Sequence, residues 1–390
     1  MRRMLKFTLS LSAALCVTVP MAQAAATSTG QPSGNQPVAY VYVSTPAGST
    51  GRNEVHAWTA SASGALTAIP GTPFQENVTS MAVNGKFLYG ATLSGTDVNS
   101  YRIEANGGLL YAVTTNITQY NNTDCASTGS VFTDRTGTTV YNMEYRGDAC
   151  ANNTYRSFKT ESATGGLQNL GESGGNSWLY QPASFIGNNV WGYSASCLGN
   201  MYWGIFGFKR SSNGLLTEVP ISAPAPAPPN GEFFCPSQAA ADGANHVAIA
   251  MQAVLQKNFS SVGAPQLAVY TAQSNGNLMT TSTVANMPRA NVGTLSDLSL
   301  APDSKLLAAA GSGGLEIFHF NGAAPVTHLG GLLTSDAIDQ CFWDQSGHLY
   351  AISGKAGKLF VFTVTTSGAH SAPGSPYTVN HAEYLAVWSK

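Results

Sequence analysis

The chain has 390 residues, and its 18 basic and 20 acidic side chains give a formal net charge of −2 at pH 7. Only 10% of the residues are charged, whereas 43% are hydrophobic. This composition is too apolar for a disordered chain, and the low charge excludes a basic nucleic-acid-binding protein and a charge-rich coiled coil.

The first residues have the pattern of a secretory signal peptide. Arg2, Arg3 and Lys6 precede an apolar stretch at 7–22, and Ala22-Gln23-Ala24 is typical of a cleavage site. The stretch is too short for a membrane span, so we expect an exported protein, periplasmic or extracellular, without a membrane-spanning segment. The predicted organisation is a signal peptide at 1–24, a flexible segment at 25–37 and one domain at 38–390.

Cys16 would leave with the signal peptide, which leaves five of the six cysteines in the mature chain. An odd number in an exported protein predicts at least one free thiol. The spacing matches no zinc-binding pattern. We expect disulfides Cys125–Cys150 and Cys197–Cys235 with Cys341 free, although the sequence alone does not fix the pairing.

A short hydrophobic strand recurs through the whole chain, at roughly 40–60 residue intervals. A second strand with an aromatic residue near its end follows each copy, as in Val55-His-Ala-Trp58, and then a tight turn such as Asn106-Gly-Gly-Leu109. Asn-Gly between two strands predicts a hairpin with a primed turn, because such turns need positive φ. The seven copies of the first strand are 38–43, 86–90, 139–142, 189–192, 246–249, 305–308 and 348–352.

A further strand precedes most of these triplets, as at 80–83, 130–133, 297–300 and 340–343. Four antiparallel strands repeated at this period predict an all-β, seven-bladed β-propeller. The first repeat lacks this preceding strand, while the C-terminal segment 383–388 matches it. We therefore predict that the C-terminal strand pairs into the N-terminal blade and closes the ring, which removes the free sheet edges.

The repeated formula resembles the lactonase or YVTN-repeat family of seven-bladed propellers, which includes 6-phosphogluconolactonase-like proteins. The resemblance rests on Tyr40-Val-Tyr-Val43, on Ala301-Pro-Asp-Ser-Lys305 and on Asn-Gly-Gly-Leu after an aromatic residue, and it covers essentially the whole mature chain. It implies a ring with a polar channel mouth and, in enzymatic members, the opening of a lactone ring.

The family's enzymatic members carry Arg and His signatures just before the inner strands, and this chain has no histidine there. Acidic residues occupy these positions in three consecutive blades, at Asp297, Asp339 and Glu383. We expect these carboxylates to converge at the channel mouth, where they could act as general bases or hold a divalent cation. Alternatively, each caps a turn or lies in solvent. Arg289, in the loop that leads into the blade of Asp297, is a further candidate for ligand binding and could instead pair with one of the acids.

Aromatic residues form a second group of candidates for ligand binding. Trp178 and Tyr180 precede an inner strand, and Tyr145, Tyr202 and Trp203 are predicted in loops on the same face. Exposed aromatic rings suit sugars or apolar ligands, although packing beneath long loops is the alternative. His381 lies beside Glu383 and is the one histidine expected near the mouth.

Two functions follow from these residues. The first is a non-enzymatic propeller, expected to be a monomer, that binds a small molecule, a glycan or a protein at the channel mouth. The alternative is a lactone hydrolase that activates water with a carboxylate or a bound divalent cation. The absent Arg and His residues favour binding, and no other cofactor is expected.

Overall fold

The structure is a computed structural model that describes residues 36–46, 53–93, 95–117, 126–146, 154–174, 179–198 and 202–390. The predicted signal peptide, nearly all of the segment at 25–37, Cys125, Cys150 and Trp178 lie outside these residues. Within the described residues, no helix is long and apolar enough to cross a membrane.

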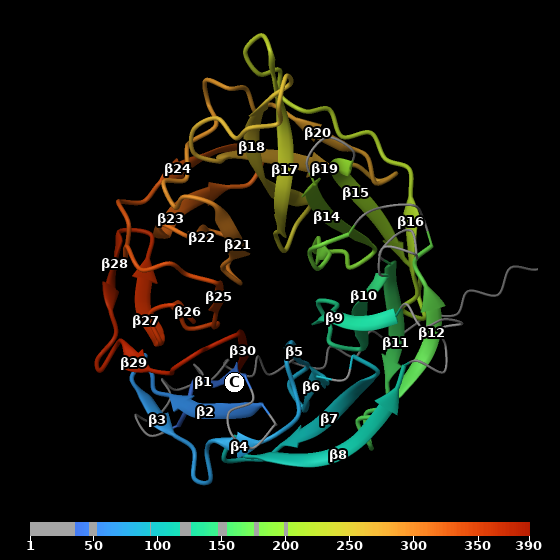
Figure 1. The fold of residues 1–390 in the computed structure, drawn as a ribbon, viewed down its shortest axis with the longest axis vertical. Coiled ribbons are helices and arrows are strands. Elements are labelled where there is room, and N and C mark those ends of the chain that lie inside the picture. The colour runs from blue at the N-terminus through green and yellow to red at the C-terminus, as the bar shows by residue number, and fades with distance from the viewer. Residues whose placement is uncertain are drawn as a thin grey trace, which may run out of the picture. The chain divides into compact units, whose positions relative to one another are not determined.

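The described strands form seven antiparallel sheets arranged as the blades of a ring (Figure 1), which is the predicted seven-bladed β-propeller. The innermost strands of the blades line a central channel. Blade 1 contains β30, β1, β2 and β3. Blade 2 contains β5–β8, blade 3 contains β9–β12, and each later blade takes the next four strands, up to β25–β28 in blade 7. Two short strands, β4 (Phe74–Gln75) and β29 (Tyr377–Thr378), pair with β2 and β27 at the ends of blades 1 and 7.

The strands are listed here by their place in the blade, from the channel outward. The innermost strands are β5 (Met81–Val83), β9 (Ala126–Thr133), β13 (Ser184–Phe185), β17 (Glu232–Ala241), β21 (Leu295–Leu300), β25 (Gln340–Trp343) and β30 (Tyr384–Ser389). The second strands are β1 (Ala39–Thr45), β6 (Phe87–Ala91), β10 (Thr139–Arg146), β14 (Trp191–Leu198), β18 (His246–Leu255), β22 (Leu306–Gly311) and β26 (His348–Ser353).

The third and fourth strands complete each blade. The third strands are β2 (Glu54–Ala60), β7 (Asp97–Ile103), β11 (Thr154–Thr160), β15 (Tyr202–Arg210), β19 (Gln266–Ala272), β23 (Gly314–Asn321) and β27 (Lys358–Thr365). The outer strands are β3 (Leu66–Ala68), β8 (Leu109–Asn116), β12 (Leu167–Glu172), β16 (Leu216–Val219), β20 (Leu278–Thr280), β24 (Ala324–His328) and β28 (Gly368–Ser371).

The C-terminal strand closes the ring as predicted. Strand β30 pairs antiparallel with β1 from Ser44↔Tyr384 to Ala39↔Ser389. The Lys390 N–H also donates to the Val38 carbonyl at 2.8 Å, so the two ends of the domain lie side by side. Blade 1 therefore combines strands from both ends of the chain, and the sheet edge that β1 would otherwise expose is covered.

The core lies between the blades. Buried side chains of the described residues form seven clusters, each built from the facing sides of two adjacent blades. Both faces of the second strands are covered, which is why β1, β22 and β26 are buried along their whole length. This double burial explains why these strands are continuous hydrophobic runs in the sequence rather than alternating ones.

The repeated tyrosines and glycines of the sequence meet at the joints between blades. Tyr193 in β14 donates its hydroxyl to the Gly276 carbonyl, at 3.0 Å, in the outer hairpin of the next blade. A Cβ added to Gly276 would lie 2.4 Å from the Trp191 ring. Tyr42 and Tyr141 make the same contact with Gly107 and Gly214 at 2.8 and 2.9 Å. The repeated sequence therefore specifies the contacts between neighbouring blades as well as the strands within each blade.

The outer hairpins are present where Asn-Gly predicts them, but their turn type differs from the prediction. The φ of Gly107 is +88°, whereas Asn106 is not among the described residues with positive φ. The Gly107 N–H bonds to the Glu104 carbonyl, and the Glu104 N–H bonds to the Gly108 carbonyl. This is a three-residue loop with one left-handed glycine, not a primed turn. The Asn106 side chain instead accepts a hydrogen bond from the Gly108 N–H at 2.9 Å.

Candidate functional site

A central channel of about 480 Å³ is lined by residues of all seven innermost strands. We call the face at which these strands begin the mouth face. The innermost strands run antiparallel to their neighbours, so the turns between second and third strands lie at the mouth face too. Phe342 on β25 lines the channel and is 43% exposed.

Hydrogen bonds between adjacent blades hold the channel wall together. In each bond, a side chain of an innermost strand, or of the residue just before it, meets the backbone of the next blade. Such bonds join Ser80 to Val131 (2.8 Å), Ser184 to Ala241 (2.8 Å), Gln238 to Ser296 (2.9 Å), Asp297 to Cys341 (2.8 Å) and Gln340 to Leu385 (2.8 Å). These side chains fix the spacing of the blades around the channel.

Asp297 belongs to this wall rather than to the mouth. Its Oδ2 accepts the Cys341 N–H and its Oδ1 accepts the Leu298 N–H, both at 2.8 Å. Burial raises the pKa of Asp297 to about 6, against the opposing effect of these two backbone donors. Its carboxylate therefore joins blade 6 to blade 7, and the free thiol predicted at Cys341 is buried beside it.

The raised pKa of Asp297 predicts a pH dependence of stability. A carboxylic acid whose pKa is higher in the folded state stabilises the fold below its unfolded pKa, and this contribution is lost as the pH rises through the folded value. The shift from 3.8 to about 6 corresponds to up to about 3 kcal/mol between pH 4 and pH 7. In urea unfolding, wild type should lose stability relative to Asp297→Asn over this range. If the free energy of unfolding changed equally with pH in wild type and in Asp297→Asn, the raised pKa of Asp297 would be contradicted.

Asp339 and Glu383 share a polar hollow at the mouth face. The hollow has a volume of about 750 Å³ and is formed by blades 7, 1 and 2. It borders the channel, because Asp339, Gln340 and Tyr384 line both. We call it the mouth hollow. Its other lining residues are Thr79, Thr92, Leu93, Gly95, Gly354, Lys355 and Ala382.

The charges of the mouth hollow are two carboxylates and one ammonium group. Asp339 Oδ2 accepts the Gly354 N–H at 2.7 Å, which fixes this carboxylate against the turn that carries Lys355. The Glu383 N–H bonds to the Ser44 carbonyl at 2.9 Å, so the backbone that presents its side chain is held by β1. Burial raises the pKa of the Glu383 carboxyl. The hollow therefore offers two charged acceptors and one charged donor to ligand hydroxyls or amines, beside the neutral hydroxyl and amide groups of its lining.

The structure brings together two of the three predicted acids, not all three. Asp297 lines the channel but not the mouth hollow. Within the described residues, no group of three or more His, Cys, Asp and Glu side chains is placed to hold a metal ion. The expected convergence of Asp297 with Asp339 and Glu383 is therefore not found, because the Asp297 carboxylate turns sideways to the backbone of blade 7.

The other predicted ligand-binding residues lie outside the mouth hollow. Arg289 is exposed in the connection between β20 and β21, where its backbone bridges to Gln266. His381 is exposed in the turn before β30, with a φ of +57°. Tyr180 is half-buried before β13. None of these three lines the channel or the mouth hollow, and Trp178 lies outside the described residues.

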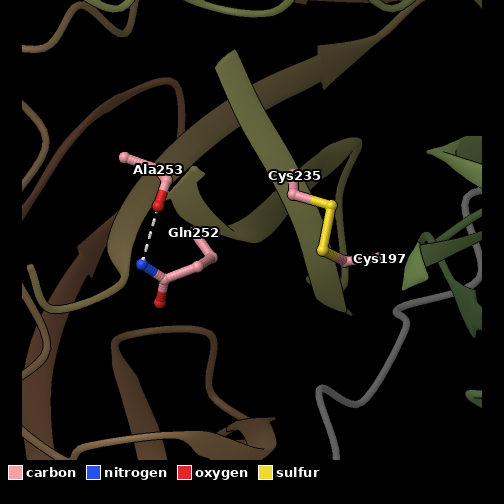
Figure 2. Close-up of a disulfide and its surroundings, with 4 residues drawn as sticks. All are labelled: Cys197, Cys235, Gln252 and Ala253. Carbon is pink, nitrogen blue, oxygen red and sulfur yellow. Dashed lines mark hydrogen bonds between the residues drawn. A yellow bond between two sulfur atoms is a disulfide. The ribbon is translucent and has the colours of Figure 1, made fainter. Parts of the chain in front are cut away.

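The disulfide Cys197–Cys235 is present as predicted and joins blade 4 to blade 5 (Figure 2). Cys197 is near the end of β14 and Cys235 is near the start of β17, so the bridge lies toward the mouth face. Near it, the Gln252 side-chain amide donates to the Ala253 carbonyl at 3.0 Å. The predicted pairing of Cys125 with Cys150 falls outside the described residues.

Sequence reasoning missed Lys355 and the contribution of blade 2. Lys355 lies in the turn Gly354-Lys-Ala-Gly357 between a second and a third strand. Because all such turns lie at the mouth face, the register of the repeat was the signal that could have identified it. The same rule would have identified Leu93, which is 49% exposed and lies in the turn between the second and third strands of blade 2.

Comparison with known proteins finds the same fold in solved structures. A Bacteroides fragilis protein proposed to be a 6-phosphogluconolactonase is similar with a TM-score of 0.64 and 14% identity, over 92% of this chain and 100% of the other. The periplasmic gluconolactonase of Pseudomonas aeruginosa is similar with a TM-score of 0.63 and 12% identity, over 90% and 99%. No family model and no curated protein matches the sequence. At these identities the likeness shows the fold alone.

Proposed function

We propose that this protein is an exported, lactonase-like propeller that binds a small polyhydroxylated molecule in the mouth hollow. The observation that carries the proposal is the pair of carboxylates, Asp339 and Glu383, in a hollow of about 750 Å³ that borders the channel. This size is typical of small-molecule sites. A small molecule or a short glycan is therefore a better fit than a protein partner.

The charges of the hollow favour a neutral ligand over a phosphorylated one. Two carboxylates face one ammonium group, Lys355, and the hollow's described lining contains no arginine or histidine. Phosphate recognition relies on charge-assisted donors, above all on arginine. Hydroxyl groups can instead donate to carboxylate oxygens without a charge conflict.

The alternative function is a lactone hydrolase, and the position of Glu383 is the observation that supports it. Burial raises the pKa of this carboxyl toward the range in which a general base or acid is effective. In such a reaction Glu383 would take a proton from the water that attacks the lactone carbonyl. The bond between the carbonyl carbon and the ring oxygen would then break, and Glu383 would return the proton to that oxygen. Lys355 is the charged donor of the same hollow that could approach the carbonyl oxygen. A divalent cation remains part of this alternative as a proposal, with Asp339 and Glu383 as its ligands.

Export is also a proposal, and it has three supports. The disulfide Cys197–Cys235 is of the kind that persists in oxidising compartments. The N-terminal sequence has the three parts of a signal peptide. One of the similar structures is described as periplasmic. We propose a monomer, because closure of the ring leaves no unpaired innermost strand in blade 1.

A thermal-shift experiment tests where the ligand binds. The mature protein is heated with D-glucono-1,5-lactone, its 6-phosphate, D-gluconate or calcium, and Glu383→Gln is compared with wild type. We expect the neutral lactone to stabilise wild type more than D-gluconate or the 6-phosphate, which are both anions, and we expect the variant to bind the lactone about tenfold more weakly, because it loses a charged acceptor. Glu104→Gln, on an exposed outer hairpin, is the matched control and should behave as wild type. Equal stabilisation of Glu383→Gln and wild type would place the site elsewhere.

A further inference from the structure

Three aromatic rings form a stepped cluster on the rim of the mouth face, outside the mouth hollow. The rings of Trp203 and Phe233 have centroids 4.9 Å apart, and those of Phe233 and Phe259 are 5.7 Å apart at 70°. Trp203 is 46% exposed and Phe259 is 37% exposed, with Phe233 half-buried between them. We call this cluster the aromatic rim.

The disulfide fixes the first two rings of the aromatic rim. Cys197 is the direct cross-strand partner of Trp203 in the β14–β15 pair. Cys235 lies two residues after Phe233 in β17, and residues two apart in a strand share one face. The bridge between Cys197 and Cys235 therefore ties the strand pair that carries Trp203 to the strand that carries Phe233 (Figure 2).

The third ring is held out of the core by its backbone. Phe259 lies in the connection between β18 and β19 and has a φ of +57°, a conformation unfavourable for a bulky residue. The connection is closed by hydrogen bonds from the Phe259 N–H to the Leu255 carbonyl, at 2.8 Å, and from the Leu255 N–H to the Ser260 carbonyl, at 2.9 Å. An apolar ring held exposed by a strained backbone points to a role at the surface.

The size and charge of the aromatic rim limit which classes of ligand it can bind. Since an aromatic side chain presents at most about 150–250 Å², the exposed parts of these rings total roughly 200 Å², far below the ~800 Å² per partner of a stable protein interface. Next to the rings in sequence, the charges of Glu232 and Lys257 are opposite, so this surface has no net charge for a polyanion.

We infer that Trp203, Phe233 and Phe259 form a stacking subsite for a neutral, β-linked glycan chain. The C–H groups on the flat face of a β-linked pyranose carry partial positive charge, and they match the negative face of an aromatic ring. Rings at different tilts suit successive sugar units of a twisted chain. Exposed side chains of Gln256, Asn258 and Ser260 beside Phe259 offer amide and hydroxyl groups to sugar hydroxyls.

The test uses two probes, the tetrasaccharides of β-1,4-linked glucose and of β-1,4-linked N-acetylglucosamine. Binding is followed by tryptophan fluorescence and by calorimetric titration of the mature protein. We expect saturable binding of at least one probe, a loss of about tenfold or more in Trp203→Ala and a smaller loss in Phe259→Ala. Tyr111→Ala removes a ring that is 54% exposed on the outer strand of blade 2, and it should bind as wild type.

Two results would overturn the inference: no saturable binding of either probe by wild type, or unchanged binding in a folded Trp203→Ala variant. A concentration-dependent dimer that Trp203→Ala abolishes would also overturn it, because the rings would then be buried against a second copy of the chain. The aromatic rim and the mouth hollow are tested separately. Glu383→Gln should leave tetrasaccharide binding unchanged, so failure of one site is distinguishable from failure of the other.

Discussion

Removal of Tyr384–Lys390 is expected to convert the protein into an aggregating species without a cooperative thermal transition. The deleted strand makes six residue pairs with β1 and buries Leu385 and Ala386 almost completely. Burial of the leucine contributes on the order of 1.5–3 kcal/mol, and burial of the alanine methyl group about 0.8 kcal/mol. The truncation also exposes β1 as a hydrophobic edge strand, which is a template for pairing with other chains. Gel filtration and circular dichroism melting measure both effects.

A circular permutant is the matched control for the truncation. In this variant, residues 384–390 precede residue 36, and a short turn joins Lys390 to the start of the domain. The link is feasible because the Lys390 N–H already bonds to the Val38 carbonyl. We expect the permutant to be monomeric and folded, since β30 and β1 then form an ordinary hairpin. A truncated protein that stays monomeric and melts cooperatively would show that β30 does not hold the ring closed.

Gly276→Ala is expected to destabilise the fold by about 3 kcal/mol or more, as measured by urea unfolding. Two effects add at this position. The φ of Gly276 is +87°, which costs an alanine roughly 1–2 kcal/mol. In addition, the new Cβ would lie 2.4 Å from the Trp191 ring of the neighbouring blade, so the joint must open.

Alanine variants at two other glycines separate the cost of positive φ from the cost of the steric clash. Gly231 has a φ of +83° and no atom within 4 Å of an added Cβ, so Gly231→Ala should show only the backbone cost of roughly 1–2 kcal/mol. Gly330 has neither a positive φ nor a close neighbour, and its alanine variant should be neutral within about 0.5 kcal/mol. Equal losses in Gly276→Ala and Gly231→Ala would mean that the glycine–aromatic joint does not stabilise the ring.

The fold was predictable because the repeat encodes contacts between blades. The tyrosines of the second strands and the glycines of the outer hairpins recur at one period because each pair meets across a joint, as Tyr193 and Gly276 do. The turn type was not predictable from Asn-Gly alone. The asparagine acts through its side chain, as Asn106 does with the Gly108 N–H, and needs no positive φ of its own.

The candidate site was predictable only in part, because a strand turns successive side chains to opposite sides. Asp339 and Glu383 stand just before their innermost strands and reach the mouth hollow. Asp297 corresponds in the repeat to Gln340, one position further, and both side chains bond sideways to the next blade. A difference of one position in the repeat therefore decides whether a side chain reaches the mouth hollow or bonds to the next blade in the channel wall.

The aromatic rim depends on features that the repeat does not contain. Phe233 lies in the first part of β17, which pairs with β18 from Glu232↔Leu255 to Ala241↔Val247. Phe259 lies in the connection beyond these two strands, in a conformation that no propensity predicts. The sequence did not show which rings would meet.

Binding and hydrolysis of D-glucono-1,5-lactone, followed together in wild type and Glu383→Gln, test the proposed function most directly. Calorimetric titration reports binding, and proton release at constant pH reports ring opening against the spontaneous rate. We expect wild type to bind the lactone without accelerating its opening, and Glu383→Gln to bind about tenfold more weakly. Ring opening accelerated by wild type and lost in Glu383→Gln would contradict the binding function and establish the hydrolase instead.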